Sequence, residues 1–144
     1  MIYYAHSKTV YNTKREEKEL DAIMKYFNVN LNSIINPKDW FDQTLSEEEI
    51  MVKCKDCVEN FSNGLVFSTY EVDKPYISRG VAQEILTAWA KNIPTYVIDS
   101  DLSIHPYNRL FHVLLDFEGR SNYRWAEIYG YTPFKIVLDN SSEI

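Results

Sequence analysis

Short apolar segments alternate along the chain with longer segments in which apolar residues repeat every three or four positions. The short apolar runs, rich in β-branched and aromatic residues, predict strands at residues 2–5, 33–36, 64–70 and 95–99. Pro37 ends the second of these runs, because proline cannot donate to a strand ladder. The periodic segments between the runs predict helices at residues 13–28, 46–63 and 79–91.

Polar residues mark the beginnings of the first two predicted helices. Thr13 with Glu16, and Ser46 with Glu49, match the S/T-x-x-E capping box, in which each side chain satisfies a free backbone N–H group. The pattern is less regular after residue 100. There, residues 110–117 fit a helix or a strand, residues 123–129 predict a helix, and residues 134–138 predict a last strand.

The order of these elements predicts the fold class. Strands that alternate with helices are typical of a parallel sheet with right-handed crossovers. We therefore expect an α/β protein with a three-layer Rossmann/flavodoxin-like fold and a mostly parallel five-stranded sheet. A length of 144 residues matches a single domain, so residues 1–144 are expected to form one domain.

Charge and hydropathy exclude two classes of partner. The net charge is −6 and no basic run is present, whereas binding to a nucleic-acid backbone needs a basic surface. Polymeric nucleic acid is therefore not expected as a partner, but a single nucleoside or nucleotide stays open. No segment reaches the roughly 18 apolar residues of a membrane span, and the N-terminus lacks the regions of a signal peptide. We expect a cytoplasmic protein that makes no contact with membranes.

The two cysteines, Cys54 and Cys57, form a C-x-x-C motif. This spacing occurs in redox pairs and in half of a zinc site, but a zinc site needs two further ligands. Both cysteines also fall on the apolar face of a predicted helix, where reduced thiols behave as small hydrophobic groups. The pattern favours core filling over metal binding or redox chemistry, and no metal or cofactor is expected.

In an open parallel sheet, ligands bind beyond the carboxyl ends of the strands, where the strand order reverses. Here the loops at residues 6–12, 36–44 and 71–79 would border that crevice. The helix that begins near Arg79 would point free N–H groups into it. The segment from Ser78 to Glu84 is therefore the expected functional edge, and Gly80 would allow a ligand to approach closely.

Each of these candidate residues also has a plain structural explanation. Gly80 could be an incidental glycine, His6 a surface loop residue, and Asp73 a turn former before Pro75. On a helical wheel Glu84 falls on the polar side, away from Val81, Ala82, Ile85, Leu86 and Trp89. Motifs of serine hydrolases, P-loop NTPases and dinucleotide-binding proteins are not found in the sequence.

The sequence GVAQEI at residues 80–85, followed by PTYVI at 94–98, resembles the nucleoside 2-deoxyribosyltransferase family. The opening IYYA at residues 2–5 is similar to the first strand of that family. The resemblance implies that Glu84 is a nucleophile that attacks C1′ of a deoxyribose, that Tyr3 orients it, and that Asp73 contacts the base or sugar. Val81 and Gln83 depart from the family pattern, which favours glycosidic cleavage over transfer.

The resemblance completes a first hypothesis about function. The chain would cleave, or transfer at, the N-glycosidic bond of a (deoxy)nucleoside or nucleoside monophosphate, and it would form a homodimer or a larger homo-oligomer. The substrate would be bound by residues of the first and third of these loops and of the start of the next helix: His6, Ser7, Ser78, Arg79 and Gly80. Two alternatives stay open, namely a non-catalytic module that binds a nucleotide or signalling molecule, and a structural protein with an empty crevice.

Overall fold

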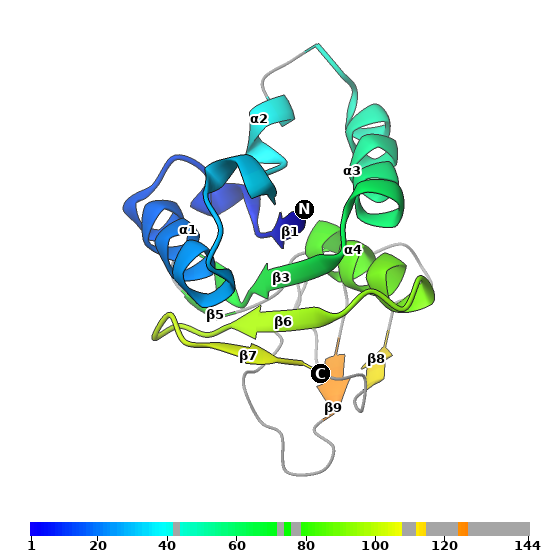
Figure 1. Cartoon of the computed structure of the whole chain (residues 1–144). Helices are drawn as coiled ribbons and strands as arrows, with labels where there is room; N and C mark the ends of the chain where they lie inside the picture. The colour runs from blue at the N-terminus through cyan, green and yellow to red at the C-terminus, as the bar shows by residue number, and fades with distance from the viewer. Residues whose placement is uncertain (42–43, 72–73, 76–78, 108–111, 115–123, 127–144) are drawn as a thin grey trace.

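Four parallel strands and one antiparallel edge strand form the sheet of the computed structural model (Figure 1). The structure describes residues 1–41, 44–71, 74–75, 79–107, 112–114 and 124–126. The sheet order is β2-β1-β3-β6-β7. Its strands are β1 (Ile2–Ala5), β2 (Ile34–Ile35), β3 (Gly64–Ser68), β6 (Thr95–Ile98) and β7 (Ile104–Pro106). The α/β fold with a mostly parallel five-stranded sheet is confirmed.

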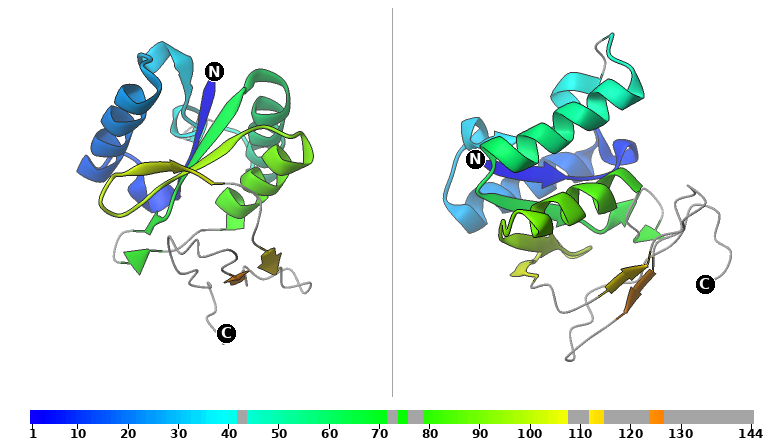
Figure 2. Two further views of the ribbon diagram at one scale, coloured as in Figure 1. Left: turned by 60° about the horizontal axis from the view of Figure 1, so that its bottom comes forward. Right: turned by 90° about the vertical axis from the view of Figure 1, so that its right-hand side faces the viewer.

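Helices cover both faces of this sheet and complete three layers (Figure 2). Helix α1 (Lys14–Phe27) lies on one face, and α3 (Glu47–Phe61) and α4 (Arg79–Ala90) lie together on the other. The shorter elements are η1 (Lys8–Val10), η2 (Leu31–Ser33), α2 (Lys38–Phe41), the pair β4 (Tyr70–Glu71) and β5 (Lys74–Pro75), and the pair β8 (His112–Leu114) and β9 (Arg124–Ala126).

Side chains of the central strands alternate between two apolar cores. Tyr3 and Phe67 pack with Ile85 under α3 and α4, whereas Tyr4 and Val66 pack under α1. All five residues of β3 are buried, as expected for a parallel strand covered on both faces. The two cores therefore place β1 and β3 at the centre of the molecule.

The predicted helix beginnings are confirmed. Thr13 caps α1 by accepting the N–H of Glu16, and Ser46 caps α3 in a complete capping box with Glu49. Helix α1 ends at Asn28, whose φ of 56° is the left-handed conformation that asparagine tolerates. No helix in the described part of the chain is long and apolar enough to cross a membrane.

One prediction for the C-terminal third is wrong, and another lies outside the described residues. The fifth strand of the sheet is β7, which the pattern missed, and the strand predicted at residues 134–138 lies outside the described residues. The turn before β7 places Leu102 at φ 73°, and leucine gives no sequence signal for such a turn. The helix predicted at residues 123–129 is wrong where the structure describes it, because Arg124–Ala126 is a strand paired with β8.

We expect the Ser46→Ala variant to lower the free energy of unfolding by about 1 kcal/mol. The substitution removes the acceptor for the Glu49 N–H group and leaves the rest of the exposed cap in place. Urea denaturation of Ser46→Ala and Ser46→Asp tests this, because aspartate is also a good N-cap residue. Ser46→Asp should keep the wild-type stability. If it loses as much stability as Ser46→Ala, the missing N-cap acceptor is not the cause of the loss.

Candidate functional site

The strand order reverses beside β1, which is where a ligand crevice is expected in this type of sheet. From β1 the chain crosses to β2 on one side and then returns to β3 and β6 on the other. Helix α4 follows β3 along the chain, and its first turn contains Gly80. A Cβ atom added to Gly80 would meet no atom of the described residues outside its own helix within 4 Å, so these residues leave room beside the first turn of the helix.

Two tyrosines on β1 each donate a hydrogen bond to a glutamate on opposite faces of the sheet. The Tyr3 hydroxyl donates to Oε2 of Glu84 over 2.6 Å, and the Tyr4 hydroxyl donates to Oε1 of Glu19 over 2.5 Å. Both tyrosines are fully buried. The chain therefore holds two Tyr–Glu pairs of the same chemistry, and their surroundings distinguish them.

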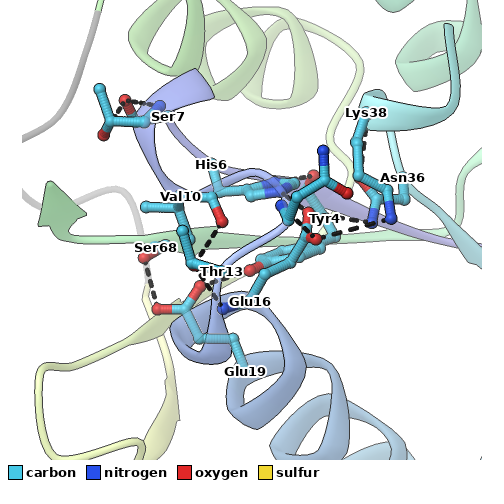
Figure 3. A network of polar contacts seen from close by, with 12 residues as sticks. Tyr4, His6, Ser7, Val10, Thr13, Glu16, Glu19, Asn36, Lys38 and Ser68 are labelled. Carbon is cyan, nitrogen blue, oxygen red and sulfur yellow. Dashed lines mark hydrogen bonds and ion pairs between the residues drawn. The ribbon is translucent and has the colours of Figure 1, made fainter. Parts of the chain in front are cut away.

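The Glu19 carboxylate is fully satisfied by neighbouring donors (Figure 3). Besides Tyr4, it accepts hydrogen bonds from Nε of Arg15 over 2.8 Å and from Oγ of Ser68 over 2.7 Å. Arg15 also donates to the carbonyl oxygens of Asp99 and Ser100, beyond the end of β6. These contacts join α1 to β1, β3 and the loop after β6, so the pair of Tyr4 and Glu19 is structural.

A second buried carboxylate, that of Glu16, holds the two loops that follow β1 and β2. It accepts from His6 Nε2 over 2.8 Å, from the Asn12 N–H over 3.0 Å and from Asn36 Nδ2 over 3.4 Å, and Lys38 Nζ lies 3.6 Å away. Burial alone would raise the pKa of Glu16. The hydrogen bonds from His6 and Asn12 and the nearby positive charges outweigh burial and lower this pKa to about 2.

His6 and Ser7, both predicted to contact substrate, have structural partners. The His6 ring stacks on Tyr4 with centroids 3.6 Å apart, and its side chain is 0% exposed. Ser7 caps η1 by accepting the N–H of Thr9 over 3.3 Å. In this arrangement, both side chains shape the loop after β1, and neither faces open space.

Glu84 lies in different surroundings from Glu16 and Glu19. Its carboxylate is partly buried, and no cation among the described residues lies within ion-pair distance of it. Burial raises the pKa of Glu84 to about 7, although the Tyr3 hydroxyl and the Cys54 thiol act in the opposite direction. A carboxyl group with so perturbed a pKa beside a switch point is typical of a reactive site.

Tyr11 is a residue of the loop after β1 whose pKa responds to the charge of Glu84, which the sequence did not reveal. Its ring is half-buried and lies 4.9 Å from the ring of His6, centroid to centroid. Burial, followed by the negative charge of Glu84, raises the pKa of Tyr11. Tyr11 thus places an aromatic side chain against His6 in the loop after β1.

The remaining predicted site residues fall near the limits of the described chain. Arg79 is the first residue of α4, which places its backbone at the expected edge. Asp73 and Ser78 lie outside the described residues. The structure therefore brings together Tyr3 and Glu84 from the predicted set, and packs Cys54 in the same core cluster as Tyr3.

A surface hollow of about 360 Å³ lies elsewhere on the molecule. Its walls are formed by residues 92–96, 106 and 107, at the amino end of β6. Ligands of parallel α/β sheets bind at the opposite ends of the strands. The hollow therefore does not belong to the site around Glu84.

The described residues contain no group of three histidine, cysteine or acidic side chains that could hold a metal ion. Comparisons of the chain with protein-family models, with curated proteins and with solved structures found no match. The class of the protein is defined by the structure itself, which is that of an α/β protein with a Rossmann/flavodoxin-like fold. Any assignment of function depends on the geometry around Glu84.

We expect the Glu16→Gln variant to be less stable than the wild type by about 2–3 kcal/mol at pH 7. The lowered pKa of Glu16 contributes stability above pH 4.5 that is lost as the pH falls toward 2. The difference should therefore shrink on the acid side in urea unfolding between pH 3 and 7. Glu17→Gln, an exposed neighbour of equal charge, is the control, and a pH-independent difference would contradict the assignment.

We expect the Glu84→Gln variant to be more stable than the wild type by about 1–3 kcal/mol at pH 8. The raised pKa of Glu84 means that its favourable contribution is complete below pH 4.5 and is lost as the pH rises through about 7. Urea unfolding from pH 4.5 to 8 should show the two proteins converging at the acid end. A loss of stability at pH 8, or an equal gain in the exposed control Glu48→Gln, would argue against a buried, strained carboxylate.

Proposed function

We propose that the chain cleaves the N-glycosidic bond of a (deoxy)nucleoside or nucleoside monophosphate, with Glu84 as the nucleophile. The proposal depends on one observation, the 2.6 Å hydrogen bond from Tyr3 to a partly buried Glu84 that has no cation near it among the described residues. The resemblance of residues 80–85 to the nucleoside 2-deoxyribosyltransferase family supports the same assignment.

The chemistry requires one carboxylate oxygen to reach the anomeric carbon while the other is held. Tyr3 holds Oε2, so the second oxygen would attack C1′. The C1′–N bond breaks as the ester forms, and the base leaves with the bonding electrons and takes up a proton. Water then hydrolyses the glycosyl ester and regenerates the carboxylate.

The contrast with Glu19 supports the choice of Glu84. The Glu19 carboxylate already accepts hydrogen bonds from Tyr4, Arg15 and Ser68, so both of its oxygens are engaged within the fold. Glu84 has fewer partners within the described residues. With a pKa of about 7, its carboxylate is more basic than that of an ordinary glutamate. The room that the described residues leave beside Gly80, one turn earlier on α4, supports access of a ligand to this carboxylate.

Aromatic side chains in the segments that follow β1 and β2 are consistent with a substrate that contains a planar base. Tyr11 packs against His6 in the loop after β1, and Trp40 packs against the core cluster that contains Tyr3. The Nζ atom of Lys53 lies 4.9 Å from the centroid of the Trp40 ring. Aromatic faces of this kind bind bases by stacking, without selecting one base over another.

A binding module without catalysis is the second candidate function, and the pKa of Glu84 favours it in one respect. At pH 7 a carboxyl group with a pKa of about 7 is protonated in roughly half of the molecules. The protonated form donates a hydrogen bond to a ligand and cannot attack it. This candidate requires tight binding of a nucleoside or nucleotide without release of free base.

We expect incubation with a pool of nucleosides and nucleoside monophosphates to release free base, detected by mass spectrometry. The Glu84→Gln and Glu84→Ala variants should lose about 1,000-fold or more in rate, because they remove the nucleophile. Tyr3→Phe should lose about 10- to 100-fold, the value of one hydrogen bond to a charged group. The wild-type rate should rise with pH through about 7, as Glu84 ionises.

The control for this experiment is Tyr26→Phe, which removes the hydroxyl of an exposed tyrosine on α1 and should keep the wild-type rate. Wild-type activity in both Glu84 variants would end the proposed mechanism. Tight binding without any product on long incubation would instead establish the binding module.

A further inference from the structure

Both nitrogens of the buried His6 ring face hydrogen-bond acceptors. Nδ1 lies 3.2 Å from the carbonyl oxygen of Tyr4, and Nε2 lies 2.8 Å from Oε2 of Glu16 (Figure 3). The side chains of His6 and Glu16 are 0% and 3% exposed, so water has little access to either contact. A neutral imidazole has one N–H group and one bare nitrogen, and it can therefore satisfy only one of the two acceptors.

Neither acceptor can supply the missing proton. A backbone carbonyl carries none. The Glu16 carboxylate also accepts from the Asn12 N–H over 3.0 Å and from Asn36 Nδ2 over 3.4 Å, and Lys38 Nζ lies 3.6 Å from its Oε1, which together favour the ionised form. A bare His6 nitrogen would turn a lone pair toward an acceptor inside the protein, which costs stability. The geometry therefore fits a ring with a proton on each nitrogen.

The aromatic surroundings of His6 also favour a positive ring. The His6 ring stacks on the Tyr4 ring with centroids 3.6 Å apart and planes within 5°, and the Tyr11 ring lies 4.9 Å away at a tilt of 53°. The faces of aromatic rings attract cations. Burial raises the pKa of both tyrosine hydroxyls, so they stay neutral and add no charge of their own near pH 7.

Charged groups on α1 and α2 offset the cost of burying a cation. The Glu16 carboxylate on α1 forms the ion pair with His6. Lys38 on α2 is a charge of the same sign as the His6 cation, but it lies against the other oxygen of Glu16. Farther along α1, Glu19 is paired with Arg15 over 2.8 Å. His6 thus supplies at Oε2 the positive charge that Lys38 supplies at Oε1.

We propose that His6 is a doubly protonated imidazolium that clamps the loops after β1 and β2 onto Glu16, and that loss of one proton weakens this clamp. Glu16 accepts from Asn12 of the first loop and from Asn36 of the second. The Asn36 side-chain oxygen in turn accepts the N–H of Lys38, at the start of α2, over 3.0 Å. Both loops border the crevice expected beyond the strands, so one buried proton fixes two of its walls.

The test is ¹⁵N NMR of the histidine rings in the full chain at pH 7.5, where an ordinary histidine is mostly neutral. The two nitrogens of an imidazolium have nearly equal chemical shifts, whereas the protonated and bare nitrogens of a neutral ring differ widely. We expect the imidazolium pattern for His6. The sequence contains two further histidines, whose signals are identified with the variants His105→Gln and His112→Gln.

The Glu16→Gln variant should convert His6 to the neutral pattern at pH 7.5. It removes the negative charge and places an amide group that can donate to a bare ring nitrogen. Glu17→Gln, at an exposed neighbouring position, should keep the imidazolium pattern. When the wild type is titrated to higher pH, the amide signals of Asn12 and Asn36 should shift with the same midpoint as His6, because both groups donate to Glu16.

A neutral His6 pattern in the wild type at pH 7.5 would overturn the proposal, and this outcome is decisive even if Glu16→Gln does not fold. A neutral pattern in Glu17→Gln would refute the specific role of Glu16. Asn12 and Asn36 signals that stay fixed while His6 loses its proton would refute the clamp. The protonation of His6 does not depend on the chemistry at Glu84, so each of these outcomes is independent of whether free base is released.

Discussion

Burial of two adjacent tyrosine hydroxyls on β1 is the constraint on which this structure depends. Tyr3 and Tyr4 are fully buried and point to opposite faces, as neighbours on a strand must. A buried hydroxyl without a partner costs about 1–3 kcal/mol, so each face has to supply an acceptor. Helix α1 supplies Glu19 and helix α4 supplies Glu84, which ties both outer layers to β1.

The two acceptors differ in what else surrounds them, and this difference separates structure from function. Glu19 belongs to a network in which Arg15 and Ser68 also donate, and this network reaches as far as the loop after β6. Glu84 accepts the hydrogen bond of Tyr3, and burial is the largest cause of its raised pKa. Networks of the first kind stabilise a fold, whereas a poorly compensated carboxylate beside a switch point is a candidate for chemistry.

Local rules predicted much of the fold and only part of the site. Capping by Thr13 and Ser46 depends on neighbouring residues, so the sequence was sufficient. The helical wheel placed Glu84 on the polar side and Leu86 on the apolar side, yet Leu86 is 37% exposed and Glu84 faces Tyr3. A wheel describes one helix and cannot reveal that a tyrosine of another element stands opposite, whereas the apolar pattern around Cys54 did predict its place in the core.

Hydrogen bonding offsets only part of the effect of burial on the pKa of Glu84, and two opposing requirements act on this balance. More donors would stabilise the ionised carboxylate, as they do for Glu16 with a pKa of about 2, but they would also lower its basicity. Fewer donors would leave it protonated at neutral pH. A pKa of about 7 lies between these limits, so a rise in pH through 7 increases the reactive fraction while it removes stability from the fold. Activity and stability at this residue must therefore respond to pH in opposite directions if Glu84 is the nucleophile.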